Sequence, residues 1–275
     1  MKIGIYTPYL DTLGGGEKYM LTIAEVLSSE NEVDIFLGTH NYSLDVNELK
    51  NKTKKIHNLD LSKVDFIKAP FGEKSSFAGR YFFLNKYDLL FYLTDGSIFY
   101  SSAKKSIIHF QVPFEKSYLN NVWGKIKMGT FKMAIFNSKF TQEVIERNWP
   151  IKGEVLYPPV NTDNFKPLKK QKKIINVGRF FGYDKAKKHS FLIESFKKLI
   201  DQKKIRDWSL ELVGGSLDGD EPYIDQLKNE AKGYDINIYP NLSFEKLIKF
   251  YGEASIYWHA TGFEEKDPKK FEHFG

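Results

Sequence analysis

The 275-residue chain contains no cysteine. This absence excludes disulfide bonds and metal sites built from thiolates, and it fits a cytosolic location. The first ten residues, MKIGIYTPYL, lack the long apolar core of a signal peptide and have the composition of a first strand. We therefore expect a cytoplasmic protein.

Long hydrophobic runs are also missing. The most apolar stretch, 81–93, is interrupted by Asn85, Lys86 and Asp88, so it is not a candidate transmembrane helix. The excess of positive charge is small, +6, from 41 Lys and Arg against 35 Asp and Glu. Such an excess favours anionic partners, either phosphorylated ligands or anionic lipid. Motifs typical of nucleic-acid binding are absent, so nucleic acid is not an expected partner.

The spacing of apolar residues alternates between strand and helix periods. Residues 2–8 have the composition of a short buried strand, and Met20, Ile23, Ala24 and Leu27 then follow helical spacing. A strand at 33–38 completes a βαβ unit, which is typical of parallel sheets. Further strands are predicted at 88–94, 106–111, 133–138 and 153–159, and a helix at 140–148 is predicted to start near Asn137 or Ser138.

Residues 161–173, NTDNFKPLKKQKK, are polar, basic and interrupted by proline, so we interpret them as a linker. The alternation then restarts. Strands are predicted at 174–180, 208–215, 236–240 and 255–260, and helices at 192–199, 223–232 and 244–253. The sequence predicts two Rossmann-like α/β domains in tandem, 1–160 and 174–275.

A glycine run, Gly14 to Gly16, separates the first predicted strand from the first predicted helix. Backbone N–H groups at such a turn favour anions, although a plain strand-to-helix turn has the same composition. The dinucleotide fingerprint needs a third glycine where Tyr19 stands, and the second strand ends at Leu37–Gly38 without an acidic residue. A P-loop is also absent, so NAD and ATP are not favoured as ligands.

Several segments taken in order carry a resemblance to a known family. They are GGGEKYMLTIAEVL, NSKFTQEVI, VLYPPVNTDNF, NVGRF, KKHSFLIESF, WSLELVGG and EHFG. In this order the chain resembles a glycosyltransferase of family 4, which has the GT-B fold of two Rossmann-like domains facing a cleft. The resemblance runs from residue 1 to residue 275. It implies a retaining hexosyltransferase that takes a nucleotide diphosphate sugar, GDP- or UDP-linked, and uses no metal or other cofactor.

The resemblance also implies roles for basic residues and glycines. Arg179 and Lys187 correspond to the family's arginine and lysine on the donor diphosphate, whose growing charge needs fixed cations. Because GYDKA is inserted between them, Lys188 is hard to separate from Lys187, and Lys185 is a weaker match. A plain solvated helix start would also contain such lysines. The donor-binding residues implied by the matching segments are Gly15, Gly16, Gly178, Lys188, Gly214, Phe274 and Gly275.

Glu272, in EHFG, corresponds to a family glutamate that contacts the transferred sugar. In the family a second glutamate follows seven residues later and holds the ribose, at a position that would be 279 here. We therefore expect the chain to be truncated within its second domain and to be weakly active or inactive as it stands. Glu264 and Glu265 are acids in a stretch, GFEEKDP, that is typical of a solvated loop.

Three histidines have weaker assignments. His109 stands at a strand end where family members often have a histidine near the donor sugar and acceptor, and a core histidine is an equal alternative. His259 and His189 fit structural positions better, in a loop and at a helix start.

The basic and aromatic segment 117–133 is typical of an ordinary surface helix or of contact with an anionic membrane. The resemblance implies a glycan or lipid-linked acceptor, with peripheral contact at the inner membrane face.

Two other functions share parts of this pattern. Nucleotide-sugar 2-epimerases have the same two-domain architecture, although the paired NVGRF and EHFG segments are not expected in them. A degenerate or truncated homologue would bind nucleotide or a partner without transfer. Survival of Arg179, the basic cluster and Glu272 favours the transferase over both alternatives.

Overall fold

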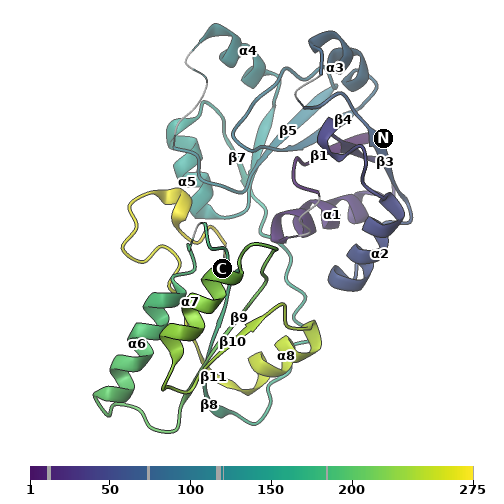
Figure 1. Cartoon of the computed structure of the whole chain (residues 1–275). Coiled ribbons are helices and arrows are strands. Elements are labelled where there is room, and N and C mark those ends of the chain that lie inside the picture. The colour runs from purple at the N-terminus through teal and green to yellow at the C-terminus, as the bar shows by residue number, and fades with distance from the viewer. Residues whose placement is uncertain (11–13, 73–74, 116–118, 120, 184, 275) are drawn as a thin grey trace. The chain divides into compact units, whose positions relative to one another are not determined.

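The computed structural model describes the chain except for residues 11–13, 73–74, 116–118, 120, 184 and 275. Its internal contacts divide the described chain into two units. The first is Met1–Pro159 together with His273 and Phe274, and the second is Val160–Glu272. Each unit contains one parallel sheet with helices on its faces (Figure 1).

The sheet of the first unit has the strand order β3-β2-β1-β4-β5-β6-β7, and every neighbouring pair is parallel. Its strands are β1 (Lys2–Tyr6), β2 (Glu32–Leu37), β3 (Val64–Lys68), β4 (Leu89–Leu93), β5 (Lys105–Phe110), β6 (Met133–Phe136) and β7 (Gly153–Val155). Its helices are α1 (Gly15–Leu27), η1 (Thr39–Asn41), α2 (Val46–His57), α3 (Phe77–Leu84), α4 (Val122–Gly129) and α5 (Lys139–Asn148). The inner strands are buried on both faces, which explains their nearly continuous apolar sequence.

Local sequence signals fix where these helices begin. The Glu17 side chain accepts a hydrogen bond of 2.7 Å from the Gly14 N–H, so a carboxylate lies at the start of α1. Asp45 caps α2 and Ser138 caps α5 through side-chain oxygens that accept from backbone N–H groups. The cap predicted at Asn137 or Ser138 is thus confirmed at Ser138.

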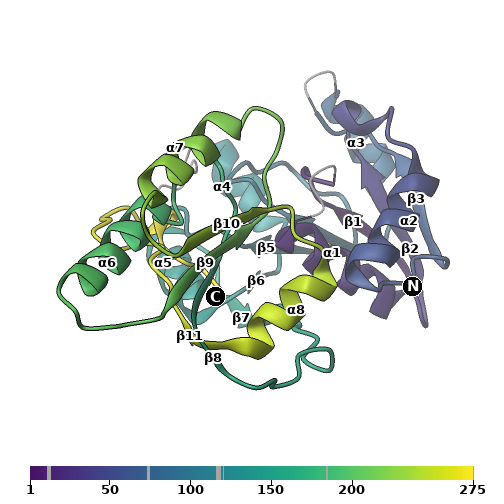
Figure 2. The ribbon, with the colours of Figure 1, turned by 60° about the horizontal axis from the view of Figure 1, so that its bottom comes forward.

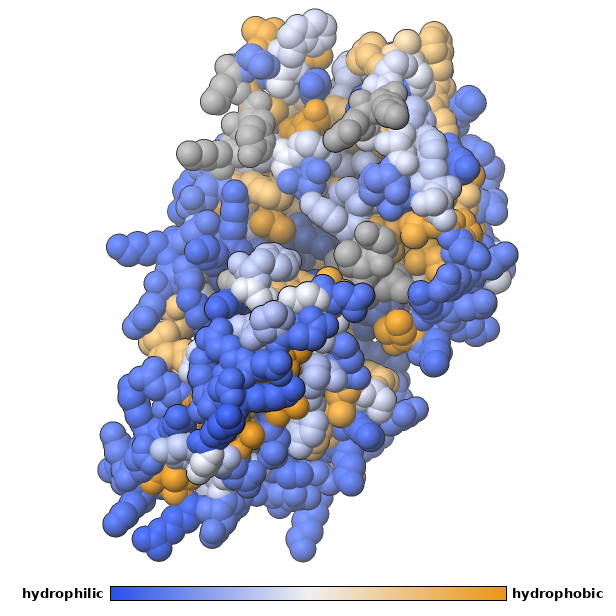
Figure 3. Space-filling model, viewed as in Figure 1, coloured by the Kyte–Doolittle hydropathy of each residue, from blue (hydrophilic) through white to orange (hydrophobic). Residues whose placement is uncertain are grey.

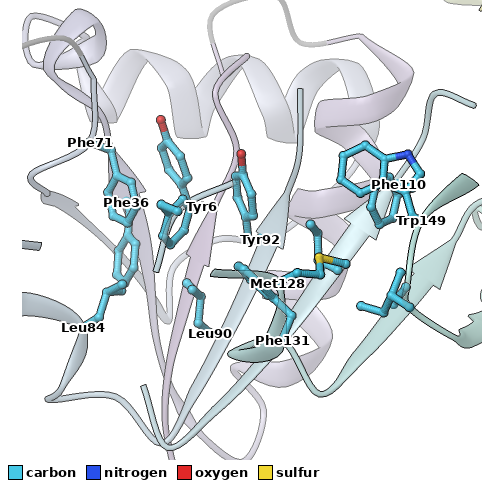
Figure 4. Packing of buried hydrophobic residues seen from close by; sticks show 14 of the residues in the cluster. Tyr6, Phe36, Phe71, Leu84, Leu90, Tyr92, Phe110, Met128, Phe131 and Trp149 are labelled. Atoms are coloured by element: carbon cyan, nitrogen blue, oxygen red, sulfur yellow. The ribbon is translucent and has the colours of Figure 1, made fainter. Parts of the chain in front are cut away.

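Helices cover both faces of the first sheet. One core contains Leu84 of α3, Met128 of α4 and Trp149 next to α5, packed against an aromatic layer from the strands (Figure 4). The stacked rings of Tyr6 and Phe71 lie in this layer with their centroids 4.1 Å apart. The opposite core is formed by α1 and the other faces of β1, β2 and β4. Many of the aromatic side chains of the sequence therefore pack in the core of this unit.

The second unit has a four-stranded parallel sheet of order β10-β9-β8-β11. Its elements are β8 (Gln171–Val177), α6 (His189–Asp201), β9 (Ser209–Gly214), α7 (Glu221–Ala231), β10 (Ile236–Pro240), α8 (Phe244–Glu253), β11 (Ala254–Tyr257) and η2 (Pro268–Lys270). α6 and α7 cover one face and α8 the other, as Figures 1 and 2 both show. The outer surface over α6 and α7 is mostly hydrophilic (Figure 3).

The alternation predicted from sequence is confirmed, with element ends that differ by a few residues. The predicted linker at 161–173 overlaps β8, which begins at Gln171. Lys172 and Lys173 lie near the start of this strand, where the backbone pairs with the neighbouring strands while the side chains stay near the surface. Lys173 in addition donates to Glu253 at 2.9 Å, which anchors the strand start to the end of α8.

Candidate functional site

The loops after β8 and β11 meet at one edge of the second sheet. All four strands are parallel, so their carboxyl ends lie at the same edge. β8 comes first along the chain and has β9 on one side and β11 on the other, which makes this a topological switch point. Open parallel sheets bind ligands outside the carboxyl ends of strands at such a point.

Two side chains approach the Glu272 carboxylate at this edge. The Lys187 ammonium donates to Glu272 Oε2 at 2.7 Å, and His259 Nε2 lies 3.6 Å from the same oxygen. Lys187 stands two residues before the first residue of α6, and His259 stands two residues after the end of β11. The side chains of Lys187 and Glu272 are 27% and 26% exposed, so both still reach solvent. The structure thus brings together two of the predicted site residues that stand 85 positions apart.

Two glycines allow the loop after β8 to lie close to β9. A Cβ atom on Gly214 would lie 1.7 Å from the carbonyl oxygen of Gly178. A Cβ atom on Gly178 would lie 2.7 Å from Cγ of Lys187. The Gly178 N–H donates to the Val213 carbonyl at 2.8 Å, which extends the strand pairing into the loop. Both predicted donor-binding glycines therefore have a packing role that positions Lys187.

Arg179 lies on the same loop and is exposed. Its guanidinium carbon is 5.3 Å from the ring centroid of Phe181, a cation–π contact that leaves the N–H donors available to an anion. A guanidinium and an ammonium thus follow the same strand, β8, on either side of the inserted GYDKA stretch. Arginine and lysine side chains of this kind can donate hydrogen bonds to an anion.

Lys188 is the N-cap residue of α6 and adopts the left-handed region, with φ of 56°. Its ammonium forms an ion pair with Glu265, which also lies 3.5 Å from Lys270. The stretch around Glu265 is a largely exposed loop, as predicted, but Glu265 itself contacts two lysines and only 21% of its side chain is exposed. Its neighbour Glu264 is exposed.

Sequence reasoning missed the two acid–base contacts that His259 and Glu265 make. The sequence predicts a structural or loop-supporting role for His259, and the structure adds that Nε2 of its ring lies 3.6 Å from Glu272 and that the ring stacks at 6.4 Å on Tyr257. Burial, with the nearby Glu272 carboxylate, raises the pKa of Tyr257. The sequence signal for His259 is its place two residues after the end of β11, because the carboxyl ends of parallel strands are where ligands bind.

The remaining predicted residues lie in the first unit. The His109 ring is fully buried within β5, and its Nδ1–H donates to the Ile135 carbonyl at 2.9 Å. Tyr19 stacks over the ring with a centroid distance of 4.6 Å. Burial lowers the pKa of His109 to about 4, so the ring is neutral at pH 7. In this conformation the imidazole has no exposed surface to offer a ligand.

Gly15 and Gly16 form the first turn of α1. A Cβ atom on Gly15 would meet nothing within 4 Å, whereas one on Gly16 would lie 2.5 Å from Oε1 of Gln111. Phe274 belongs to the first unit, where its ring lies 6.1 Å from that of Tyr157. Gly275 lies outside the described residues. The donor-binding role of these four residues stays a prediction.

Among the residues that the structure describes, no three His, Asp or Glu side chains gather in an arrangement able to hold a metal ion. Within the same residues, every helix is too short or too polar to cross a membrane.

No protein-family model and no curated protein sequence matches the chain. Solved structures are similar to it. The crystal structure of TarM matches with a TM-score of 0.68 and 9% identity, over 94% of this chain and 80% of TarM. A mutant of S. aureus TarM in complex with fondaparinux, alpha-GlcNAc-glycerol and UDP matches with a TM-score of 0.60 and 9% identity, over 98% of this chain and 89% of that one.

An alpha-glucosyltransferase in complex with UDP and a DNA 13-mer matches with a TM-score of 0.54 and 10% identity, over 94% of this chain and 71% of that one. At these identities the likeness concerns the fold alone. Together with the two parallel sheets, it shows that the chain has two Rossmann-like units of the GT-B fold.

Proposed function

We propose that the chain is a retaining glycosyltransferase of family 4, which moves a hexose from a GDP- or UDP-linked sugar to a glycan or lipid-linked acceptor without a metal. The observation that carries this proposal is the contact of Lys187 with Glu272 at the switch point of the second sheet, where Arg179 also lies on the loop after β8. The fold adds support, since two of the similar structures contain UDP.

The proposed chemistry follows from the charges at this edge. Breaking the bond between sugar and nucleotide leaves negative charge on the diphosphate, and that charge grows in the transition state. Lys187 and Arg179 would stabilise it, since preorganised cations cost little reorganisation when the bond breaks. Glu272 holds the Lys187 ammonium at 2.7 Å, so the cation is fixed by an ion pair before any phosphate arrives.

Glu272 has a second task in this proposal. A carboxylate accepts several hydrogen bonds, so Glu272 can bind a hydroxyl of the transferred sugar while it keeps Lys187 in place. His259, 3.6 Å from the same oxygen, would orient the carboxylate. Glu272 would thus hold the sugar and Lys187 the diphosphate, so that the bond to be broken lies between the two partners of one ion pair.

A turnover assay with the full chain tests the proposal. UDP-glucose, UDP-GlcNAc and GDP-mannose serve as donors, and both release of free sugar and transfer to glycan are measured. Because the sequence predicts weak activity, we expect slow turnover by the unsubstituted chain. Lys187→Ala and Glu272→Gln are each expected to lower kcat/KM about 100-fold or more, the usual loss for one charge-stabilising group. Lys198→Ala is the matched control, because Lys198 lies on α6, the helix that follows Lys187, in an exposed pair with Glu194.

The outcomes separate the alternatives. Inversion at C2 of the donor sugar without transfer would assign an epimerase. Tight nucleotide binding without turnover would assign a non-catalytic protein. Turnover that is equal in Lys187→Ala and Lys198→Ala would contradict the proposed site.

A further inference from the structure

The first unit contains a hollow of about 440 Å³ between the turn after β4 and the start of α4. Its lining includes Asp95, Ser97, Asn121, Trp123 and Lys127. The volume lies within the usual range for small-molecule sites, and the lining combines one large aromatic face with several hydrogen-bonding groups. None of the residues proposed above for the donor is among the lining residues, so the hollow is separate from the proposed donor site.

The hollow lies beside the switch point of the first sheet. β1 has β2 on one side and β4 on the other, so the strand order reverses between β1 and β4. The turn that lines the hollow begins at Thr94, directly after the carboxyl end of β4. The topology of this unit thus favours a ligand at the same kind of edge where the second unit carries Glu272.

The turn after β4 holds Asp95 in a fixed arrangement. The Ser97 N–H donates to Asp95 Oδ1 at 2.9 Å, and the Gly96 N–H donates to Thr94 Oγ1 at 2.9 Å. Gly96 has φ of 100°, which favours glycine. A carboxylate keeps capacity for further hydrogen bonds after accepting one, and Asp95 is exposed.

The start of α4 fixes Trp123 on the opposite wall. Asn121 caps the helix by accepting from the Gly124 N–H at 2.7 Å. A Cβ atom on Gly124 would lie 2.8 Å from Cα of Leu119, so the first turn packs closely against the preceding chain. The Trp123 side chain is nevertheless 68% exposed. The capped first turn of α4 therefore presents the Trp123 ring to solvent beside the polar side chains of the lining.

This combination suits a sugar ring better than a phosphate. A pyranose has an apolar C–H face, which can stack on an indole, and a rim of hydroxyl groups, which hydrogen-bond to carboxylate, amide and hydroxyl side chains. Among the described lining residues, the charged side chains are Asp95 and Lys127, one of each sign. Asp95 would repel an anionic ligand. A neutral ligand can donate hydrogen bonds to Asp95 and accept them from Lys127.

We propose that this hollow binds a pyranose ring of a neutral glycan, stacked on Trp123 and hydrogen-bonded to Asp95. Naming this glycan as the acceptor rests on the proposed transferase function. The binding site itself does not.

Glycan binding by the full chain tests this inference directly. Saturation-transfer NMR with maltotriose, chitotriose and mannotriose as probes measures binding without any turnover. At least one probe is expected to bind, and its Kd is expected to rise about tenfold or more in Trp123→Ala and in Asp95→Asn, as for the loss of a central contact. Phe82→Ala is the matched control, since Phe82 is an equally exposed aromatic (68%) on α3 of the same unit.

The results distinguish this inference from the proposed function. If no donor is turned over but Trp123→Ala abolishes glycan binding, the transferase proposal fails and the glycan site stands. If no probe binds, or if Trp123→Ala and Phe82→Ala bind glycan equally well, the glycan site is wrong. If transfer occurs with equal acceptor KM in both variants, the glycan bound here is not the acceptor. Binding to phosphatidylglycerol vesicles that is lost in Trp123→Ala, without glycan binding, would instead assign Trp123 to a membrane surface.

Discussion

Gly214 shows how a single absent side chain shapes the second unit. Its Cα faces the Gly178 carbonyl so closely that a Cβ atom would lie 1.7 Å from that oxygen. The obstacle is backbone, which cannot rotate away as a side chain can. The loop that bears Arg179 and supports Lys187 therefore depends on glycine at this position.

We expect Gly214→Ala to destabilise the second unit by about 1–3 kcal/mol or more, the usual cost of overpacking. The neighbouring Gly215→Ala is the matched control, because a Cβ atom there would meet only Oδ1 of Asn241, at 3.9 Å. Urea unfolding of both variants measures the difference. Equal midpoints for the two variants would show that the loop after β8 can shift without cost.

Two buried histidines make individual strands and helices sensitive to acid. His109 in β5 and His189 at the start of α6 are both fully buried, and in each ring Nε2 has no hydrogen-bond partner among the described residues. Burial lowers the pKa of each histidine from its ordinary 6.5 to about 4. The unfolded chain then binds more protons than the folded chain between these two pH values, so stability is complete above pH 6.5 and falls toward pH 4.

The expected loss by pH 4 is about 3 kcal/mol for each histidine, from the size of the pKa shift. The free energy of unfolding of each unit, measured between pH 4 and 7, tests this expectation. His109→Gln should flatten the pH dependence of the first unit, and His189→Gln that of the second. An unchanged slope in the corresponding unit would show that the buried ring is not the group that titrates.

The elements between η1 and β4 were the ones that sequence patterns did not reveal. α2 is dominated by Lys and Asn, so its apolar face is reduced to a few side chains such as Leu49. β3 is an edge strand with polar Asp65 and Lys68, which weakens the strand pattern. β3 is stabilised by its pairing with β2. α2 is stabilised by its Asp45 cap and by the hydrogen bond that Lys50 donates to the Val64 carbonyl at 2.7 Å, rather than by a strong apolar face.

At the scale of the whole molecule, the two units have separate cores. The clusters of the first unit and those of the second share no residue, and the smaller cluster of the second unit has only Ile175, Val213 and Ala254 as buried members among the described residues. Separate cores favour separate cooperative unfolding.

Urea unfolding should therefore show two transitions, with the second unit unfolding first, at a midpoint lower by about 0.5 M or more. Fluorescence of two single-tryptophan variants follows each unit. One keeps Trp149, buried in the first core, and the other keeps Trp258, packed against the second. Coincident curves from both reporters would mean that the two units unfold as one.

The sequence by itself determined the alternation of strands and helices, the two-unit organisation and the residue types of the candidate site. These are local properties: strand and helix periods, caps such as Ser138, and the glycines of NVGRF and LVGG. It also pointed to Glu272 and the basic cluster through the family resemblance, although their roles stay proposals.

Only the tertiary structure decided which of these residues meet. The contact of Lys187 with Glu272, the approach of His259 and the ion pair of Lys188 with Glu265 depend on strand order, which places β11 beside β8. The burial of His109 and the exposure of Trp123 likewise follow from packing. Periodicity describes neighbours along the chain, whereas these contacts join positions whose proximity is fixed by how the sheet is assembled.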